Sequence, residues 1–258
     1  MNNQGELIQR LVVGAILIFV AVAEVWLGGV AFWILVTIGG LVMLSEFSGL
    51  LKSSTQDTRL ALFAFCIPLG ILSPLAAGPH YLGIGLIFGT AVAVYVVTRK
   101  AGLGAGLVYV GLPAFALLWL RDRPDDGLLL SFWALSLVWA TDIGAYFAGR
   151  AIGGPKLAPT ISPNKTWAGL GGGVIAALLL GWALSHWAGL PRGLALAAVP
   201  LAVLAQMGDL FQSWMKRRAG VKDSGRLLPG HGGVLDRLDG LVTSVPIAAL
   251  IVALGFSQ

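Results

Sequence analysis

The amino-acid sequence predicts an all-α polytopic membrane protein with about nine transmembrane helices, the N-terminus in the cytoplasm and the C-terminus outside. The first supporting observation is composition: of 258 residues, 57% are hydrophobic and 11% are charged, whereas ordinary soluble domains contain roughly 25% charged residues. The second is a series of long apolar runs, and the third is an uneven distribution of Lys and Arg between them. So few charges would not cover a soluble globule, and so many apolar residues exclude intrinsic disorder.

Nine apolar runs account for most of the chain, and a membrane-spanning helix needs about 20 mostly apolar residues. Tight links such as Gly28-Gly29 suit helix hairpins, and no polar stretch is long enough for a soluble domain. The first run is interpreted as a retained helix, because the N-terminal segment has no obvious small-x-small cleavage site. The runs cover residues 8–27, 30–50, 60–77, 80–98, 103–120, 128–148, 167–189, 193–213 and 241–256.

The basic residues predict which side of the membrane each link occupies, because cytoplasmic loops are enriched in Lys and Arg. With nine spans, fourteen of the 17 basic residues fall on the side of the N-terminus, which includes the loops 149–166 and 214–240. Adding or removing one span would mix the two sides, so the bias supports an odd number of spans. The net charge of +5 thus reflects cytoplasmic loops, and no nucleic-acid partner is expected.

The richest polar segment, residues 209–239, holds ten of the chain's charges and mixes both signs. Its glycines, Gly232 and Gly233 among them, allow a backbone to present N–H groups to an anion. Carboxylates near membrane depth are costly and usually face a cavity or a partner. Two or three of them beside several cations favour a Mg²⁺ ion that holds a polyphosphate. The alternative is a set of ion pairs that anchor the loop.

A second polar group precedes the seventh run. Asp142 lies about one and a half turns before the cytoplasmic end of the sixth helix, and Lys165 lies just before the seventh. Helix starts attract phosphate through free N–H groups, and Lys165 would add a full charge there. We expect Ser162 or Asn164 to cap the seventh helix, with Pro163 in its first turn. The alternative is a capped membrane helix with positive flanks and no ligand.

Three other polar positions carry weaker signals. Glu46 lies near a helix end and is interpreted as an interfacial residue, as is Glu24. Cys66 lies inside an apolar run and is interpreted as a small buried side chain. His231 is flanked by glycines within the charged segment, and three roles stay open for it: a phosphate contact, a proton carrier or a residue that orders the loop.

The pattern of residues 213–239 is S-x-x-K-R-x4-K-D-x4-L-P-x-H-G-G-x-x-D-R-x-D. It resembles the signature of the phosphatidate cytidylyltransferases, the CDP-diacylglycerol synthases. Residues 156–166, K-L-A-P-x-x-S-P-N-K-T, and the stretch around Asp142 also resemble segments of that family. The hydrophobic organisation agrees along the whole chain, although the first 130 residues carry no motif.

The resemblance implies that CTP and phosphatidic acid react to give CDP-diacylglycerol and pyrophosphate. It also implies Mg²⁺ dependence, with room for a second, monovalent cation, and a homodimer in the lipid bilayer. The site would face the cytoplasm from a bacterial-type inner (plasma) membrane, in agreement with the charge count. Residues 1–127 would form a scaffold of five helices with dimer or lipid contacts, and residues 128–258 would form the catalytic part with four helices.

The resemblance and the charge pattern together give each polar residue an expected role in this reaction. Carboxylates would bind the metal, cations would hold phosphates, and Gly232 and Gly233 would close the backbone on the nucleotide. The expected metal ligands are Asp209, Asp236 and Asp239. The expected catalytic residues are Asp209, Asp236, Lys165, Lys216 and Arg237. The expected substrate-binding residues are Ser213, Arg217, Lys222, Asp223, His231, Gly232, Gly233, Asn164 and Asp142.

Two other functions compete with this prediction. A CTP-dependent polyprenol kinase, or a cytidylyltransferase for another lipid phosphate, would share the nucleotide site and differ in its apolar groove. A transporter of an anionic solute would use intramembrane Asp and Lys as a translocation site. The charges crowd at one membrane face, and no inverted repeat is obvious, which disfavours the transporter.

Overall fold

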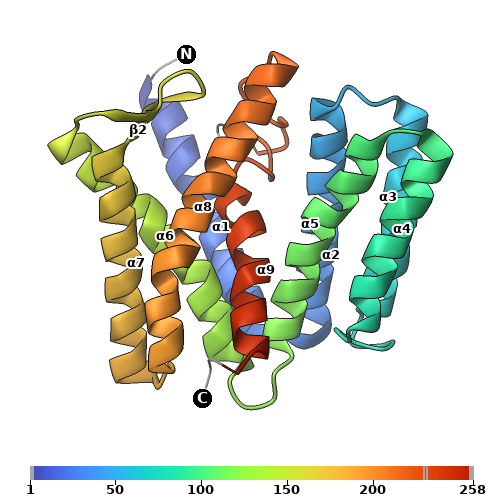
Figure 1. The fold of residues 1–258 in the computed structure, drawn as a ribbon, viewed down its shortest axis with the longest axis horizontal. Coiled ribbons are helices and arrows are strands. Elements are labelled where there is room, and N and C mark those ends of the chain that lie inside the picture. The colour runs from blue at the N-terminus through green and yellow to red at the C-terminus, as the bar shows by residue number, and fades with distance from the viewer. Residues whose placement is uncertain (1–2, 229, 231, 256–258) are drawn as a thin grey trace. The chain divides into compact units, whose positions relative to one another are not determined.

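The protein is described here by a computed structural model of residues 3–228, 230 and 232–255. Within these residues it contains nine α-helices and one two-stranded hairpin (Figure 1). Each helix overlaps one of the predicted apolar runs, whereas the hairpin was not predicted. The helices are α1 (Asn3–Leu27), α2 (Gly29–Leu50), α3 (Thr55–Ile71), α4 (Leu82–Thr98), α5 (Ala101–Arg121), α6 (Gly127–Ile152), α7 (Trp167–Ala188), α8 (Arg192–Ala219) and α9 (Asp239–Ala253), and the strands are β1 (Lys156–Ala158) and β2 (Ser162–Thr166).

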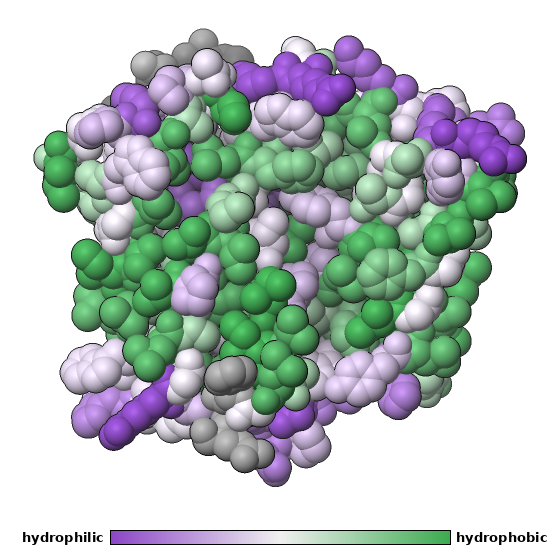
Figure 2. Space-filling model, viewed as in Figure 1, coloured by the Kyte–Doolittle hydropathy of each residue, from purple (hydrophilic) through white to green (hydrophobic). Residues whose placement is uncertain are grey.

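Five of the described helices, α2, α5, α6, α7 and α8, are long and apolar enough to cross a membrane by length and composition. Shorter apolar helices cover residues 12–27, 82–98 and 239–253. On the face drawn in Figure 2, hydrophobic side chains cover the middle of the helices, and hydrophilic ones gather near their ends. The chain is therefore a helical membrane protein, while nine crossings and the sidedness of the termini stay predictions.

The chain divides into two compact units. Unit 1 comprises Met1–Asp122 and Arg218–Leu238, and unit 2 comprises Arg123–Arg217 and Asp239–Gln258. The boundary follows Asp122, whereas the predicted one follows residue 127, and unit 1 also takes the whole loop between α8 and α9. The functional division into a scaffold and a catalytic part stays a prediction.

In unit 1, the helices α2, α3, α4 and α5 lie side by side (Figure 1). Small residues allow close approach, because a Cβ at Gly104 would lie 2.8 Å from the Ala91 carbonyl oxygen, as is typical of membrane helix pairs. Hydrogen bonds tie the ends of the bundle together. Trp33 Nε1 donates to the Leu69 carbonyl at 2.8 Å, and Arg121 Nε donates to the Val25 carbonyl at 2.6 Å.

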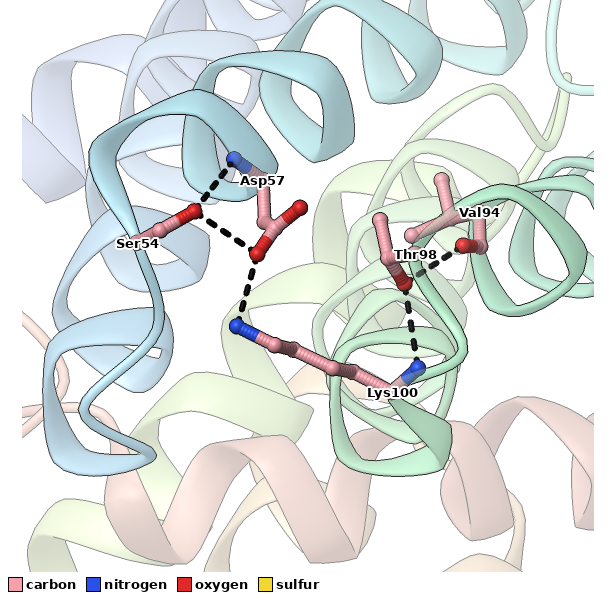
Figure 3. A network of polar contacts seen from close by, with 5 residues as sticks. All are labelled: Ser54, Asp57, Val94, Thr98 and Lys100. Atoms are coloured by element: carbon pink, nitrogen blue, oxygen red, sulfur yellow. Dashed lines mark hydrogen bonds and ion pairs between the residues drawn. The ribbon is translucent and has the colours of Figure 1, made fainter.

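A polar network joins the starts of α3 and α5 (Figure 3). Ser54 caps α3, since its Oγ accepts from the Asp57 N–H at 3.1 Å. Lys100 Nζ lies 2.6 Å from Asp57 Oδ2, and its backbone N–H donates to Thr98 Oγ1 at 3.2 Å. The Lys100 hydrogen bond, followed by that of Ser54, lowers the pKa of Asp57. One carboxylate thus orders the first turn of α3 and holds the start of α5.

In unit 2, α6 and α7 are in close contact through glycines. A Cβ at Gly172 would overlap the Ala148 side chain and lie 2.8 Å from the Gly144 carbonyl oxygen. Farther along, a Cβ at Gly149 would lie 3.5 Å from the Gly169 Cα. Side chains at these positions would force the two helices apart, so the glycines set the distance between α6 and α7.

The connection between α6 and α7 differs from the prediction. Residues 162–166 form strand β2, which pairs antiparallel with β1 in the register Lys156↔Thr166, so Pro163 lies in a strand rather than in a first helical turn. The cap of α7 is Thr166, whose Oγ1 accepts from the Gly169 N–H at 3.0 Å. The prediction that Ser162 or Asn164 caps α7 was wrong, because strand pairing extends the chain up to Thr166.

The prediction for Cys66 was also wrong. The side chain lies on an exposed face of α3, together with Phe63 and Ile67, which are 75% and 56% exposed. A helix that faces lipid shows apolar residues outward as well as inward, so an apolar run does not reveal which of its residues are buried within the protein.

Candidate active site

A polar cluster in unit 2 surrounds Lys165 of β2; we call it the α8 cluster. Lys165 Nζ lies 2.5 Å from Asp209 Oδ2 and donates to Gln206 Oε1 at 3.0 Å. The Gln206 amide continues to α6, because its Nε2 lies 3.4 Å from Asp142 Oδ1. The Lys165 side chain is 17% exposed and that of Asp209 is 30% exposed. A partly buried cation of the hairpin therefore contacts α8 directly and is linked to α6 through Gln206.

Helical spacing explains why three residues of α8 belong to this cluster. Gln206, Asp209 and Ser213 are three and four residues apart and share one helix face. Ser213 Oγ donates to Asp209 Oδ1 at 3.3 Å, so both carboxylate oxygens of Asp209 have a partner. The hairpin supplies Lys165 immediately before the α7 cap at Thr166. Gln206 was missed by the sequence analysis, although a polar residue in an apolar run, one turn before Asp209, was the available signal.

Asp239, the first residue of α9, lies close to the α8 cluster because α8 and α9 approach at Gly208. A Cβ at Gly208 would lie 2.5 Å from the Asp239 carbonyl oxygen, and Thr243 Oγ1 donates to the Leu204 carbonyl at 2.9 Å. Asp209, Asp142 and Lys216 are close enough to Asp239 to interact with it electrostatically. Asp239 and Lys216 therefore lie in the same unit as the α8 cluster and within electrostatic range of each other.

The oxygen donors of this cluster suit a hard divalent cation. Within the part of the chain that the structure describes, no three His, Cys, Asp or Glu side chains are grouped so as to hold a metal ion. Mg²⁺ needs fewer protein ligands, because it commonly uses one or two carboxylates and completes its shell with substrate phosphates and water. The repulsion among the carboxylates of Asp209, Asp239 and Asp142 would also decrease with a cation between them.

A second polar cluster, in unit 1, is built around Asp236; we call it the loop cluster. Asp236 is buried, and its Oδ2 accepts from the backbone N–H groups of Ser224 at 2.8 Å and Gly233 at 2.9 Å. Gly232 has a φ of +82°, and a Cβ there would lie 2.8 Å from Asp236 Oδ2. The glycines were expected to present N–H groups to a ligand, yet the Gly233 N–H points to Asp236 in this structure.

Glu46 of α2 also belongs to the loop cluster, and it was interpreted from the sequence as an interfacial residue. Its carboxylate accepts three hydrogen bonds from Ser224, Val234 and Leu235. These partners are 178 to 189 residues away along the chain. No motif surrounds Glu46, so the sequence offered no signal for this contact.

The remaining predicted site residues line the same two regions. In unit 2, Asn164 is exposed on the hairpin, and Arg217 Nε approaches the Ile161 carbonyl at 3.5 Å. In unit 1, Lys222, Asp223 and Arg237 are exposed. His231 lies outside the described residues, and its role stays open. The structure thus brings together Asp142, Lys165, Asp209, Ser213, Lys216 and Asp239 in one unit, and Asp223, Gly232, Gly233 and Asp236 in the other.

Known proteins match this chain over nearly its whole length. The profile of the Cytidylyltransferase family matches residues 8–254. A phosphatidate cytidylyltransferase of Brucella suis biovar 1 (strain 1330) is 42% identical, over 98% of this chain and 94% of the relative. Those of Bacillus subtilis (strain 168) and Pseudomonas aeruginosa are 34% and 38% identical, over 95% and 96% of this chain and 97% and 98% of their own lengths. The chain therefore belongs to the Cytidylyltransferase family.

Proposed function

We propose that the α8 cluster and the loop cluster serve one reaction, the transfer of CMP from CTP to phosphatidate with release of pyrophosphate. The activity itself follows from relatedness: the chain is a CTP-dependent phosphatidate cytidylyltransferase, since relatives of that name match it at 34–42% identity along nearly its full length. The observation that carries the assignment of the site is the Lys165–Asp209 pair, a partly buried ion pair whose Asp209 precedes the signature segment 213–239 in the sequence.

The chemical step is an in-line displacement. A phosphate oxygen of phosphatidate forms a bond to the α-phosphorus of CTP, the bond from that phosphorus to the bridging oxygen of the β-phosphate breaks, and pyrophosphate leaves. The attacking oxygen is already anionic near neutral pH, so no strong general base is required. Catalysis depends on aligning two anions and reducing the repulsion between them.

As Mg²⁺ ligands we propose Asp209 and Asp239 of unit 2 and Asp236 of unit 1, and we leave a place for a second, monovalent cation. The donor chemistry supports the ion: Asp209 and Asp239 are carboxyl groups within electrostatic range of each other, and carboxylate oxygens are ligands that Mg²⁺ uses. When bound, Mg²⁺ would offset the negative charge of the CTP phosphates. Asp236 differs because its Oδ2 already accepts two backbone hydrogen bonds, so it would contribute to the ion while it also orders the loop.

The cations of the chain have the complementary task. Lys165 is oriented by Asp209 and Gln206, so its ammonium group is in place before an anion arrives. We assign Lys216, Arg217, Lys222 and Arg237 to the phosphates of the two substrates, with Asn164 and Ser213 as hydrogen-bond donors. An arriving phosphate would share Lys165 with Asp209, which lowers the cost of bringing two anions together.

We also propose that the site faces the cytoplasm of a bacterial-type inner membrane and that the enzyme is a homodimer with about nine spans. The fourteen basic residues on the side of the loops 149–166 and 214–240 support this orientation. CTP is a cytoplasmic nucleotide, and phosphatidate keeps its acyl chains in the bilayer. A site at this membrane face would reach both substrates.

The test is the product formed by the purified protein from labelled CTP, Mg²⁺ and phosphatidate in detergent micelles. We expect CDP-diacylglycerol and one pyrophosphate per lipid, identified by mass spectrometry, and a Lys165→Met protein that forms neither at a comparable rate. An Asp126→Asn protein, changed at an ion pair with Arg123, serves as the control. A phosphorylated lipid together with CDP would instead indicate a lipid kinase and overturn the proposal.

A further inference from the structure

Glu46 lies on α2, in the half of the chain that carries no motif, and it contacts the signature segment in unit 1. We propose that Glu46 is a positioning residue that holds this segment in its reactive shape. Its Oε1 accepts from the Val234 N–H at 3.0 Å. Its Oε2 accepts from the Leu235 N–H at 2.8 Å and from Ser224 Oγ at 2.9 Å.

The chemistry of these contacts requires a carboxylate. All three partners are donors, and an ionised carboxylate accepts at both oxygens without presenting a proton of its own. A glutamine would direct an N–H₂ group at one set of donors, which would replace hydrogen bonds by repulsion. Within the described residues, Glu46 takes part in no ion pair within 4.0 Å. Its charge is therefore directed to the signature segment, where charge-assisted hydrogen bonds are stronger than neutral ones.

Two glycines provide a second, independent sign that the segment is shaped around Glu46. A Cβ at Gly225 would overlap Glu46 Oε1, and a Cβ at Gly233 would overlap both Glu46 Oε2 and Ser224 Oγ. Both glycines therefore lie where any side chain would displace the carboxylate. The close approach explains why these two positions lack side chains, without appeal to a bound ligand.

Glu46 is connected to the proposed chemistry through Ser224. The Ser224 hydroxyl donates to Glu46, and the Ser224 N–H donates to Asp236. Gly233 donates to Asp236, and the next two residues donate to Glu46. The two carboxylates thus hold the segment at the same two places, so a change at Glu46 would loosen Asp236. This inference rests on the proposed function, because it assigns Glu46 to the site that the function requires.

The test compares Glu46→Gln with Glu46→Asp, Ser224→Ala and the control Asp57→Asn. The control also converts a carboxylate of unit 1 to an amide, but at the α3 start (Figure 3). We expect Glu46→Gln to lower kcat/KM for CTP by about tenfold or more and Ser224→Ala to lower it less. Glu46→Asp should restore part of the loss, because it keeps the charge.

A readout independent of activity is tryptic cleavage after the exposed Arg226, measured on the full-length protein without substrates. Glu46→Gln should raise its rate by about tenfold, whereas Asp57→Asn should not. Ser224→Ala combined with Glu46→Gln should add little to either effect, since the two side chains contact each other. Should Glu46→Gln fail to fold, the Ser224→Ala protein, which lacks a single contact, provides the test alone.

Unchanged cleavage and unchanged kcat/KM in both Glu46→Gln and Ser224→Ala would overturn the inference. Cleavage that rises equally in Asp57→Asn would overturn it as well, because the effect would then reflect general destabilisation. A failure of the proposed function looks different: the unaltered protein would form no CDP-diacylglycerol, while the cleavage rates would still report whether Glu46 orders the segment.

Discussion

The two polar clusters use the same residue types in opposite ways. In the α8 cluster, the Asp209 carboxylate contacts side chains, Lys165 and Ser213, and it lies near other carboxylates. In the loop cluster, Asp236 and Glu46 each accept two hydrogen bonds from backbone N–H groups. Side-chain partners can exchange for a ligand with little change in the fold, whereas backbone partners define the path of the chain. The contacts of Asp209 can thus exchange for a ligand, whereas the backbone contacts of Asp236 and Glu46 also order the loop.

The largest effect is expected for Asp209→Asn. This change removes the charge that holds Lys165 and that is assigned to Mg²⁺, and it should lower kcat by about 10²- to 10³-fold. Tryptic cleavage after Arg226 should stay at the level of the unaltered protein, because the hydrogen bonds of the loop cluster to Asp236 and Glu46 do not involve Asp209. Initial rates at saturating CTP and the cleavage assay measure the two effects. A fast Asp209→Asn enzyme would remove the basis for placing the chemistry at the α8 cluster.

A smaller effect on activity is expected at Asp236. Two substitutions there distinguish the loss of the carboxylate charge from the loss of the hydrogen bonds that order the loop. Asp236→Ala removes the acceptor of the Ser224 and Gly233 N–H groups, so it should lower kcat/KM by about 10²-fold and raise cleavage after Arg226. Asp236→Asn keeps one oxygen that can accept both hydrogen bonds, so cleavage should stay low and the loss of rate should reflect the missing charge. Equal cleavage in the Ala and Asn proteins would contradict the ordering role.

The elements that depend on local composition were predictable from the sequence, whereas those that depend on distant contacts were not. Apolar runs revealed all nine described helices, because a membrane helix satisfies its backbone hydrogen bonds within the segment. Helical spacing also related Ser213 to Asp209. In contrast, the α7 cap was placed wrongly, since strand pairing with residues 156–158 decides where the helix begins. Gln206 was overlooked, although its neighbours on α8 were identified.

Glu46 shows why the rest of the site was not predictable. The charge and glycine density of residues 209–239 indicate a functional segment. Glu46, which contacts this segment, lies 178 residues or more before its partners in the sequence. A carboxylate near a helix end has the same local pattern whether it faces water or holds a loop. The tertiary contact alone distinguishes these cases, and no periodicity in one sequence records it.

A substitution at Gly172 should disturb the α8 cluster and leave the loop cluster intact. A Gly172→Val side chain would overlap Ala148, and overpacking of this kind should cost about 2 kcal/mol of stability. Because α6 carries Asp142, the change should disturb the α8 cluster while cleavage after Arg226 stays low. Gly171→Val is the matched control, since a Cβ there meets nothing within 4 Å. Thermal unfolding should show a lower Tm for Gly172→Val alone; equal losses at both positions would indicate that helix propensity, rather than contact with α6, is responsible.

The smallest effect is expected at Asp57, which lies in neither cluster and precedes the apolar run of its helix. Its pKa is lowered from 3.8, chiefly by the hydrogen bond from Lys100. A lowered pKa in the folded state means that the carboxylate stabilises the fold above its unfolded pKa and that this contribution is lost as the pH falls through the folded pKa. Asp57→Asn should therefore lower Tm slightly at pH 7 and make no difference once the pH is well below 3.8. A Tm difference of the same size in acid would contradict the charge of Asp57, paired with Lys100, as the source of the effect.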